Sequence, residues 1–185
     1  ESINMNPNQL IEYEGKSPVL SKEVFLAPGS KIIGDVFIGS KTSIWYNCVI
    51  RGDVNYIKIG DNTNIQDGTV IHVSSNGFSA TGGGGAPTKI GNNVTIGHNA
   101  TVHACTIKDN SLIGMGSTIL DGAIINKMAI VAAGSLIPPR SIIGDGELWA
   151  GNPGKLIRKI NDREKTLIRN TPEVYSVLRK KFLKK

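Results

Sequence analysis

The chain has 185 residues, of which 22 are glycine and 25 are isoleucine, and it carries a net charge of +6. The positive excess is confined to one end, because residues 1–154 contain ten basic and twelve acidic residues whereas residues 155–185 contain eleven basic and three acidic residues. This distribution argues against a nucleic-acid partner for the main body. No run approaches the roughly 20 consecutive apolar residues of a membrane-spanning helix, so we expect no membrane span.

Two cysteines, Cys48 and Cys105, are too few for a disulfide framework, which favours a reducing compartment. We therefore expect a cytoplasmic protein, or a protein of the mitochondrial matrix if a presequence has been removed. The length suits one medium-sized core. We expect a repetitive body at residues 1–154, with repeats from about residue 24, followed by a basic helical segment at residues 155–185.

An aliphatic residue recurs at every sixth position through most of the body. A helix cannot present one apolar face at this period, because six residues rotate it by about 600°, whereas a strand that turns a corner every six residues can. The pattern predicts an all-β fold, a parallel β-helix. Its left-handed form, a triangular prism of about six coils here, resembles the hexapeptide-repeat superfamily, and an antiparallel sandwich would not hold this register. The eighteen inward residues are Leu26, Ile32, Ile38, Ile44, Ile50, Ile59, Ile65, Ile71, Ile90, Ile96, Val102, Ile107, Ile113, Ile119, Ile125, Val131, Ile137 and Ile143.

Two interruptions break the register. The first is a nine-residue step between Ile50 and Ile59, which contains Arg51-Gly52-Asp53. The second is a loop from about Val73 to Thr88 with four consecutive glycines at 82–85. No Lys-Ser or Lys-Thr pair follows these glycines as a P-loop would require, so a surface loop is favoured over a ligand-binding loop.

Helical signals follow the end of the β pattern at Gly151-Asn152-Pro153-Gly154. Asn161 with Glu164 resembles a capping box, and Thr171-Pro172 resembles a second helix start. Four apolar residues then share one helix face, and we expect this face to pack against the prism or a neighbouring subunit. A membrane-surface or nucleic-acid role is the alternative for the basic residues. The apolar residues are Val174, Val177, Leu178 and Phe182, and the basic residues off this face or at the end are Arg179, Lys180, Lys184 and Lys185.

All three histidines lie around the glycine-rich loop. His72 and His103 each directly follow an inward residue, and if the loop adds 13 residues to their separation of 31, the remaining 18 make one coil. We therefore expect the two side chains to stack on one edge, about 4.8 Å apart. His98 should lie on the next face, too far away to share an ion within one chain. A trimer could bring His98 of one copy to the pair of another, which predicts three interfacial metal sites with three imidazoles each, as in catalytic zinc sites.

The motifs resemble the γ-class carbonic anhydrase family over most of residues 15–160. They are Arg51-Gly52-Asp53, the run from Ile59 to Gly68, His72, Ile96-Gly97-His98, His103-Ala104-Cys105, Gly114-Met115-Gly116 and Trp149-Ala150-Gly151-Asn152-Pro153. The resemblance implies a homotrimer in which His72 and His103 of one subunit and His98 of its neighbour bind zinc, with iron or cobalt as alternatives. It also implies reversible hydration of carbon dioxide to bicarbonate by metal-bound hydroxide.

The same resemblance implies roles for five further residues. Gln66 would hydrogen-bond metal-bound water and Asn64 would orient its amide. Arg51, Asp53 and Asp67 would form a charged network that either contacts bicarbonate or only holds the trimer together. Glutamates that serve as proton relays in active members are replaced here by Val54 and the neighbourhood of Ser75, which implies weak or absent hydration.

Three alternatives remain at the sequence level. Cys105 could be an extra metal ligand, although a small packed residue is favoured. The protein could be an acyltransferase of the same superfamily that uses one histidine as a base toward acyl-coenzyme A, which would leave two histidines unexplained. It could also be a non-catalytic, partner-binding trimer that keeps the metal as a structural element.

Overall fold

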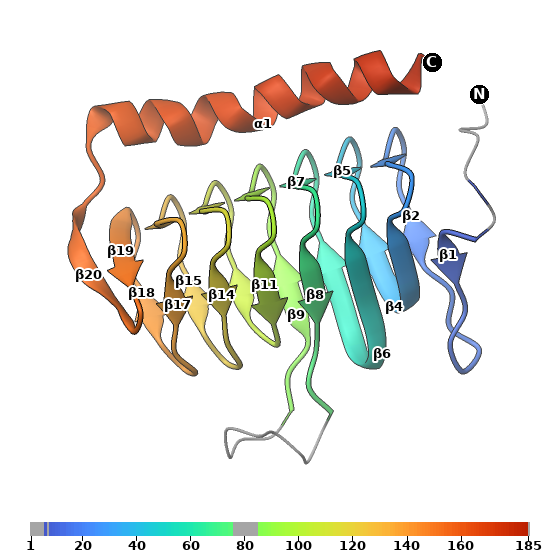
Figure 1. Cartoon of the computed structure of the whole chain (residues 1–185), viewed down its shortest axis with the longest axis horizontal. Helices are drawn as coiled ribbons and strands as arrows, with labels where there is room; N and C mark the ends of the chain where they lie inside the picture. Colours follow the sequence, from blue (N-terminus) through green and yellow to red (C-terminus); the bar gives the residue numbers. More distant parts are fainter. Residues whose placement is uncertain (1–5, 7, 76–84, 185) are drawn as a thin grey trace.

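The computed structural model describes residues 6, 8–75 and 85–184. The described chain winds into a parallel β-solenoid with three faces, along which a single C-terminal helix runs (Figure 1). The glycine-rich loop predicted between Val73 and Thr88 falls largely on residues 76–84, which lie outside the described residues.

The first two faces share the strands β4 (Lys31–Ile38) and β6 (Val49–Ile59), which run across a corner. Face 1 is completed by β1 (Leu10–Ile11), β8 (Val70–His72), β11 (Thr101–His103), β14 (Thr118–Ile119) and β17 (Leu136–Ile137). Face 2 is completed by β2 (Val19–Leu20), β9 (Thr88–Ile90), β12 (Thr106–Ile107), β15 (Ile124–Ile125) and β18 (Ile142–Ile143).

Face 3 is a separate eight-stranded sheet. Its parallel strands are β3 (Phe25–Leu26), β5 (Ser43–Ile44), β7 (Asn64–Ile65), β10 (Thr95–Ile96), β13 (Leu112–Ile113), β16 (Ile130–Val131) and β19 (Glu147–Gly151). The last strand, β20 (Gly154–Lys159), pairs antiparallel with β19, so the segment expected to be helical begins as a strand that folds back on the final coil.

The predicted left-handed parallel β-helix is confirmed, but it has about seven turns instead of about six. The additional strands are β1 and β2 at the start and β19 at the end, and Leu10, Leu20 and Trp149 there are only partly buried against the core. The hexapeptide period misses the first coil because the chain between β1 and β2 makes an extra turn, closed by an antiparallel bridge between Tyr13 and Lys16.

The core consists of the repeated aliphatic positions. All eighteen residues predicted to point inward are buried, with exposed fractions of 7% or less. Burial of one such side chain contributes about 1.5–3 kcal/mol, so the stacked isoleucines supply most of the apolar stabilisation. At the first interruption Gly52 lies so close to β4 that a Cβ there would overlap the Asp35 carbonyl oxygen, which explains the glycine in Arg51-Gly52-Asp53.

One continuous helix, α1 (Asp162–Leu183), covers face 3 (Figure 1). The predicted capping box is confirmed, since the Asn161 side chain accepts from the Glu164 amide and Glu164 accepts from the Asn161 amide. The predicted second helix start at Thr171-Pro172 is wrong, because Pro172 lies inside α1. Neighbouring turns and packing hold the helix together at this point, where proline lacks the amide proton for one helical hydrogen bond.

The predicted apolar face of the helix is only half correct. Leu178 and Phe182 pack with Tyr175 on a cluster formed by Phe25, Ala27 and Trp45. Val174 and Val177 instead point away and are 54% and 53% exposed.

The prediction that Arg179 lies off the packed face is wrong. The residue is 1% exposed, and its Nη1 donates to the Glu23 carbonyl oxygen at 2.8 Å.

No helix of the described part of the chain has the length and apolar character needed to cross a membrane.

Candidate functional site

Two histidines stack on the edge between faces 1 and 2. Ile71 and Val102 point inward from β8 and β11, so the residues that follow them turn outward at the corner. His72 and His103 are direct partners in the strand register, as the sequence predicted. His72 Nδ1 and His103 Nε2 face each other at 3.1 Å.

The other nitrogen of each ring is held by an aspartate. His72 Nε2 lies 2.9 Å from Asp53 Oδ1, and His103 Nδ1 lies 2.6 Å from Asp121 Oδ1. Ser74 fixes the second carboxylate, because its hydroxyl donates to Asp121 Oδ2 at 2.5 Å. If each ring donates its proton to its aspartate, both facing nitrogens carry lone pairs, which repel each other unless a cation lies between them.

Electrostatics favours the charged form of both aspartates and the neutral form of His72. Burial opposes ionisation of Asp53, but the Val54 amide, His72 and Arg51 all bond to its carboxylate and lower its pKa to about 2. Burial also opposes ionisation of Asp121, and there hydrogen bonds from Ser74 and His103 lower the pKa. The pKa of His72 is lowered, mainly by burial, which favours the neutral imidazole that metal ions bind.

The pair fits two ligands of one metal ion. Two nitrogens at 2.0–2.1 Å from a tetrahedral zinc lie roughly 3.3 Å apart, close to the 3.1 Å observed. A carboxylate on the far side of each imidazole is the usual support for histidine ligands, because it fixes the ring and its tautomer.

His98 lies at the opposite end of face 1. It follows β10 at the corner from which β11 begins, and its Nδ1 is 2.9 Å from Asp67 Oδ1. Asp67 also accepts from the Tyr46 amide at 3.2 Å. Within the described residues of a single chain, no group of three or more histidine, cysteine, aspartate or glutamate side chains is placed to hold a metal ion.

Asn64 and Gln66 lie on the third face, in β7 and directly after it. Both point away from the prism core, yet they are 1% and 6% exposed because α1 covers this sheet. The Gln66 amide donates to Asn64 Oδ1 at 3.0 Å, and the Asn64 amide donates to Thr95 Oγ1 at 3.0 Å. This chain of hydrogen bonds leaves Gln66 Oε1 as an acceptor with a defined direction. Gln66 borders a cavity of about 500 Å³ between face 3 and the first half of the helix.

Sequence reasoning missed Asp121 and Ser74. Asp121 follows the inward Ile119 by two residues and lies in the coil next to that of His103. The hexapeptide register could therefore have placed Asp121 near His103. Ser74 is 47 residues away from Asp121, across the loop, and no periodicity connects them. Cys105 packs in the core as favoured, and burial raises the pKa of its thiol to about 12.

The three-faced β-solenoid with its six-residue repeat defines a class, the hexapeptide-repeat proteins. A family model described as bacterial transferase hexapeptide (six repeats) matches residues 87–121. A crystal structure of a hexapeptide transferase family protein from Anaplasma phagocytophilum superposes with a TM-score of 0.86 and 41% identity, covering 95% of this chain and 98% of that one.

Curated relatives narrow the class to a family. Gamma carbonic anhydrase 2, mitochondrial, of Arabidopsis thaliana is 50% identical over 160 residues, which are 86% of this chain and 56% of the plant protein. The chain thus spans little more than half of that relative's length. A carbonic anhydrase of Geobacillus kaustophilus is 42% identical over 150 residues, covering 81% of this chain and 78% of the bacterial protein. The chain belongs to the gamma carbonic anhydrase family.

Proposed function

We propose that this protein is a carbonic anhydrase that hydrates carbon dioxide reversibly at metal sites shared between copies of the chain. His72 and His103 of one copy and His98 of its neighbour in a homotrimer would hold zinc, with iron or cobalt as alternatives. One observation carries the proposal, which is that each of the three histidines is held by an aspartate. The pairs are His72 with Asp53, His98 with Asp67, and His103 with Asp121.

These pairs give the aspartates a definite role. Histidine ligands require one ring nitrogen for the metal and a partner for the other nitrogen, which fixes the tautomer and the ring orientation. Three unrelated surface histidines would have no reason to share this arrangement. Asp53 and Asp67, expected to act in a charged network with Arg51, are therefore proposed as positioning residues for His72 and His98.

When bound, zinc lowers the pKa of water to about 7, which makes hydroxide available near neutral pH. Gln66 would accept a hydrogen bond from water at the metal site. Its Oε1 would be the acceptor, because its amide nitrogen already donates to Asn64. Arg51 bonds to Asp53 and is half exposed, so its guanidinium would supply positive charge for the bicarbonate product.

We expect hydration to be slow. The places of the proton-relay glutamates in active members are occupied by Val54 and the neighbourhood of Ser75, and the loop sequence from 74 to 87 contains no aspartate or glutamate. Efficient hydration requires a group that carries a proton away from the site.

We propose the cytoplasm or the mitochondrial matrix as the compartment.

The test combines metal analysis with stopped-flow hydration assays on zinc-loaded and anaerobically iron-loaded protein. We expect one metal ion per chain and measurable hydration, and we expect His98→Ala to lose both. Lys181→Ala, on the exposed side of α1, is the control and should retain both. Stoichiometric metal in His98→Ala would contradict the site shared between copies.

An acyltransferase is the second candidate, because the solved relative from Anaplasma phagocytophilum is named as a hexapeptide transferase family protein. Such an enzyme needs one histidine base, which leaves two of the three histidine–aspartate pairs without a purpose. Metal-free protein that binds acyl-coenzyme A would favour this candidate. A metal-loaded protein without hydration would instead favour a non-catalytic trimer.

A further inference from the structure

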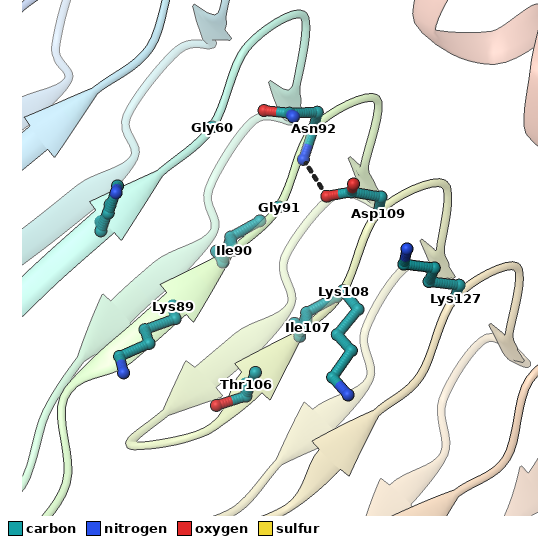
Figure 2. A pocket seen from close by; sticks show the side chains of 11 residues that line it. Gly60, Lys89, Ile90, Gly91, Asn92, Thr106, Ile107, Lys108, Asp109 and Lys127 are labelled. Carbon is teal, nitrogen blue, oxygen red and sulfur yellow. Dashed lines mark hydrogen bonds between the residues drawn. The ribbon is translucent and has the colours of Figure 1, made fainter.

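Four lysines lie around one hollow on face 2, at the end of this face that is nearest face 3. Lys58 and Lys89 are direct partners in the register of β6 and β9, and Lys108 and Lys127 follow β12 and β15. All four side chains are exposed and come from four successive coils. Figure 2 shows Lys89, Lys108 and Lys127 on neighbouring coils of this face. We refer to the four residues as the lysine row.

The lysine row surrounds a hollow of about 260 Å³. Part of its floor is Gly60 and Gly91, which have no side chains to fill it, together with Ile90 and Ile107. The strand turns require these glycines, because a Cβ on Gly60 would overlap the backbone carbonyl of Gly91 and a Cβ on Gly91 would overlap the backbone nitrogen of Asp109. The hollow is therefore built into the fold.

The lysine row carries more positive charge than its neighbouring side chains offset. Among the described residues, none of the four ammonium groups forms an ion pair. Asp109 lines the hollow and offsets one of the four charges, and its Oδ1 accepts from the backbone N–H of Asn92 at 2.8 Å (Figure 2). Residues 1–154 carry a net charge of −2, yet four of their ten basic residues gather here.

We propose that the lysine row binds the diphosphate group of a nucleotide-like small molecule. Successive coils are about 4.8 Å apart, and Lys108 and Lys127 also lie further along their strands than Lys89, whose register partner is Thr106. The row therefore runs diagonally over more than about 14 Å, longer than a single phosphate can contact. Lysine ammonium groups bind phosphate oxygens as flexible point charges, and several of them together attract a polyanion strongly.

Two exposed aromatic residues beside the row suit the organic part of such a ligand. Phe37 is the register partner of Lys58, and Tyr56 lies under Lys89, whose Nζ is 5.9 Å from the ring centroid. Each of the two aromatic residues is 38% exposed. A flat base could stack on either ring while the diphosphate occupies the hollow.

The test is calorimetric titration of the full chain with ADP, pyrophosphate and sulfate at equal ionic strength. We expect ADP and pyrophosphate to bind and sulfate to bind at least tenfold more weakly. The variant K89Q/K108Q should lose about tenfold or more in affinity for both ligands. The matched control K181Q/K184Q removes the same charge from two exposed lysines at the C-terminal end of the helix and should stay within about twofold of the unmodified chain.

A further variant separates the two parts of the ligand. Tyr56→Ala should weaken ADP binding and leave pyrophosphate binding unchanged, and an unchanged affinity for ADP would overturn the stacking of a base on this ring. Equal losses in the two lysine variants, or binding of sulfate as tight as that of pyrophosphate, would overturn the diphosphate site. The histidines are intact in all of these variants, so the outcome does not depend on carbonic anhydrase activity.

Discussion

At the residue scale, the most informative feature is the aspartate attached to each histidine. The histidines were found from the sequence because they are few and sit in register with inward residues. Asp121 was not found, because an aspartate at a corner of a β-helix is common and only the three-dimensional contact to His103 at 2.6 Å distinguishes it.

Asp121→Asn should weaken metal binding. Asparagine keeps the size of the side chain but removes the charge that supports the His103 ring, and changes to such partners typically cost about 10–100-fold in metal affinity. The measurement is competition with a zinc chelator of known affinity. Asp145→Asn, at a corner in another part of the prism, is the control. Unchanged affinity in Asp121→Asn would show that His103 needs no carboxylate support.

At the element scale, α1 illustrates both what local sequence decides and what it leaves open. The capping box was predicted because its two partners are three residues apart. The interior position of Pro172 was not predicted, because a Thr-Pro pair is an equally good helix start, and only packing along face 3 decides that the helix continues.

The start of the helix should be sensitive to acid. Hydrogen bonds from Arg158 and the Asn161 amide lower the pKa of Glu164 to about 2, from an ordinary value of 4.5. A carboxylate with a lowered pKa stabilises the fold above its unfolded value, and this contribution is lost as the pH falls from about 4.5 toward 2.

We therefore expect Glu164→Gln to be less stable than the unmodified chain at pH 7, with the difference shrinking toward pH 2. Asn161→Ala should cost about 1 kcal/mol at pH 7, because it removes the cap. Urea unfolding followed by circular dichroism measures both effects. Glu173→Gln, on the exposed side of α1, is the control. A pH-independent difference for Glu164→Gln would mean that the ion pair with Arg158 contributes nothing.

At the scale of the whole molecule, one chain separates His98 from the other two histidines by the width of face 1. The sequence predicted this separation from the six-residue register, and it is the reason for proposing a trimer. Symmetric assemblies repeat the same interface, so every copy would donate His98 to one neighbour and receive it from the other.

A mixture of two inactive variants tests this arrangement. His98→Ala keeps the pair and His103→Ala keeps His98, so neither variant alone can build a complete site. Refolding them together at equal amounts should restore about a quarter of the metal sites, if the chains assemble at random. The amount of metal bound per chain, measured after free metal has been removed from the protein, gives the fraction of sites restored. No recovery in trimers shown to contain both chains would contradict the shared site.

The sequence by itself determined the β-helix and the stacking of His72 on His103, because a six-residue aliphatic period has only one way to bury itself and fixes the register of each coil. It did not determine the additional first coil, where the extra turn at Tyr13–Lys16 breaks the period. Nor did it determine the burial of Arg179, the partners of Asp121 or the lysine row. These features depend on which residues meet across coils and loops of unpatterned length, and only the tertiary structure brings them together.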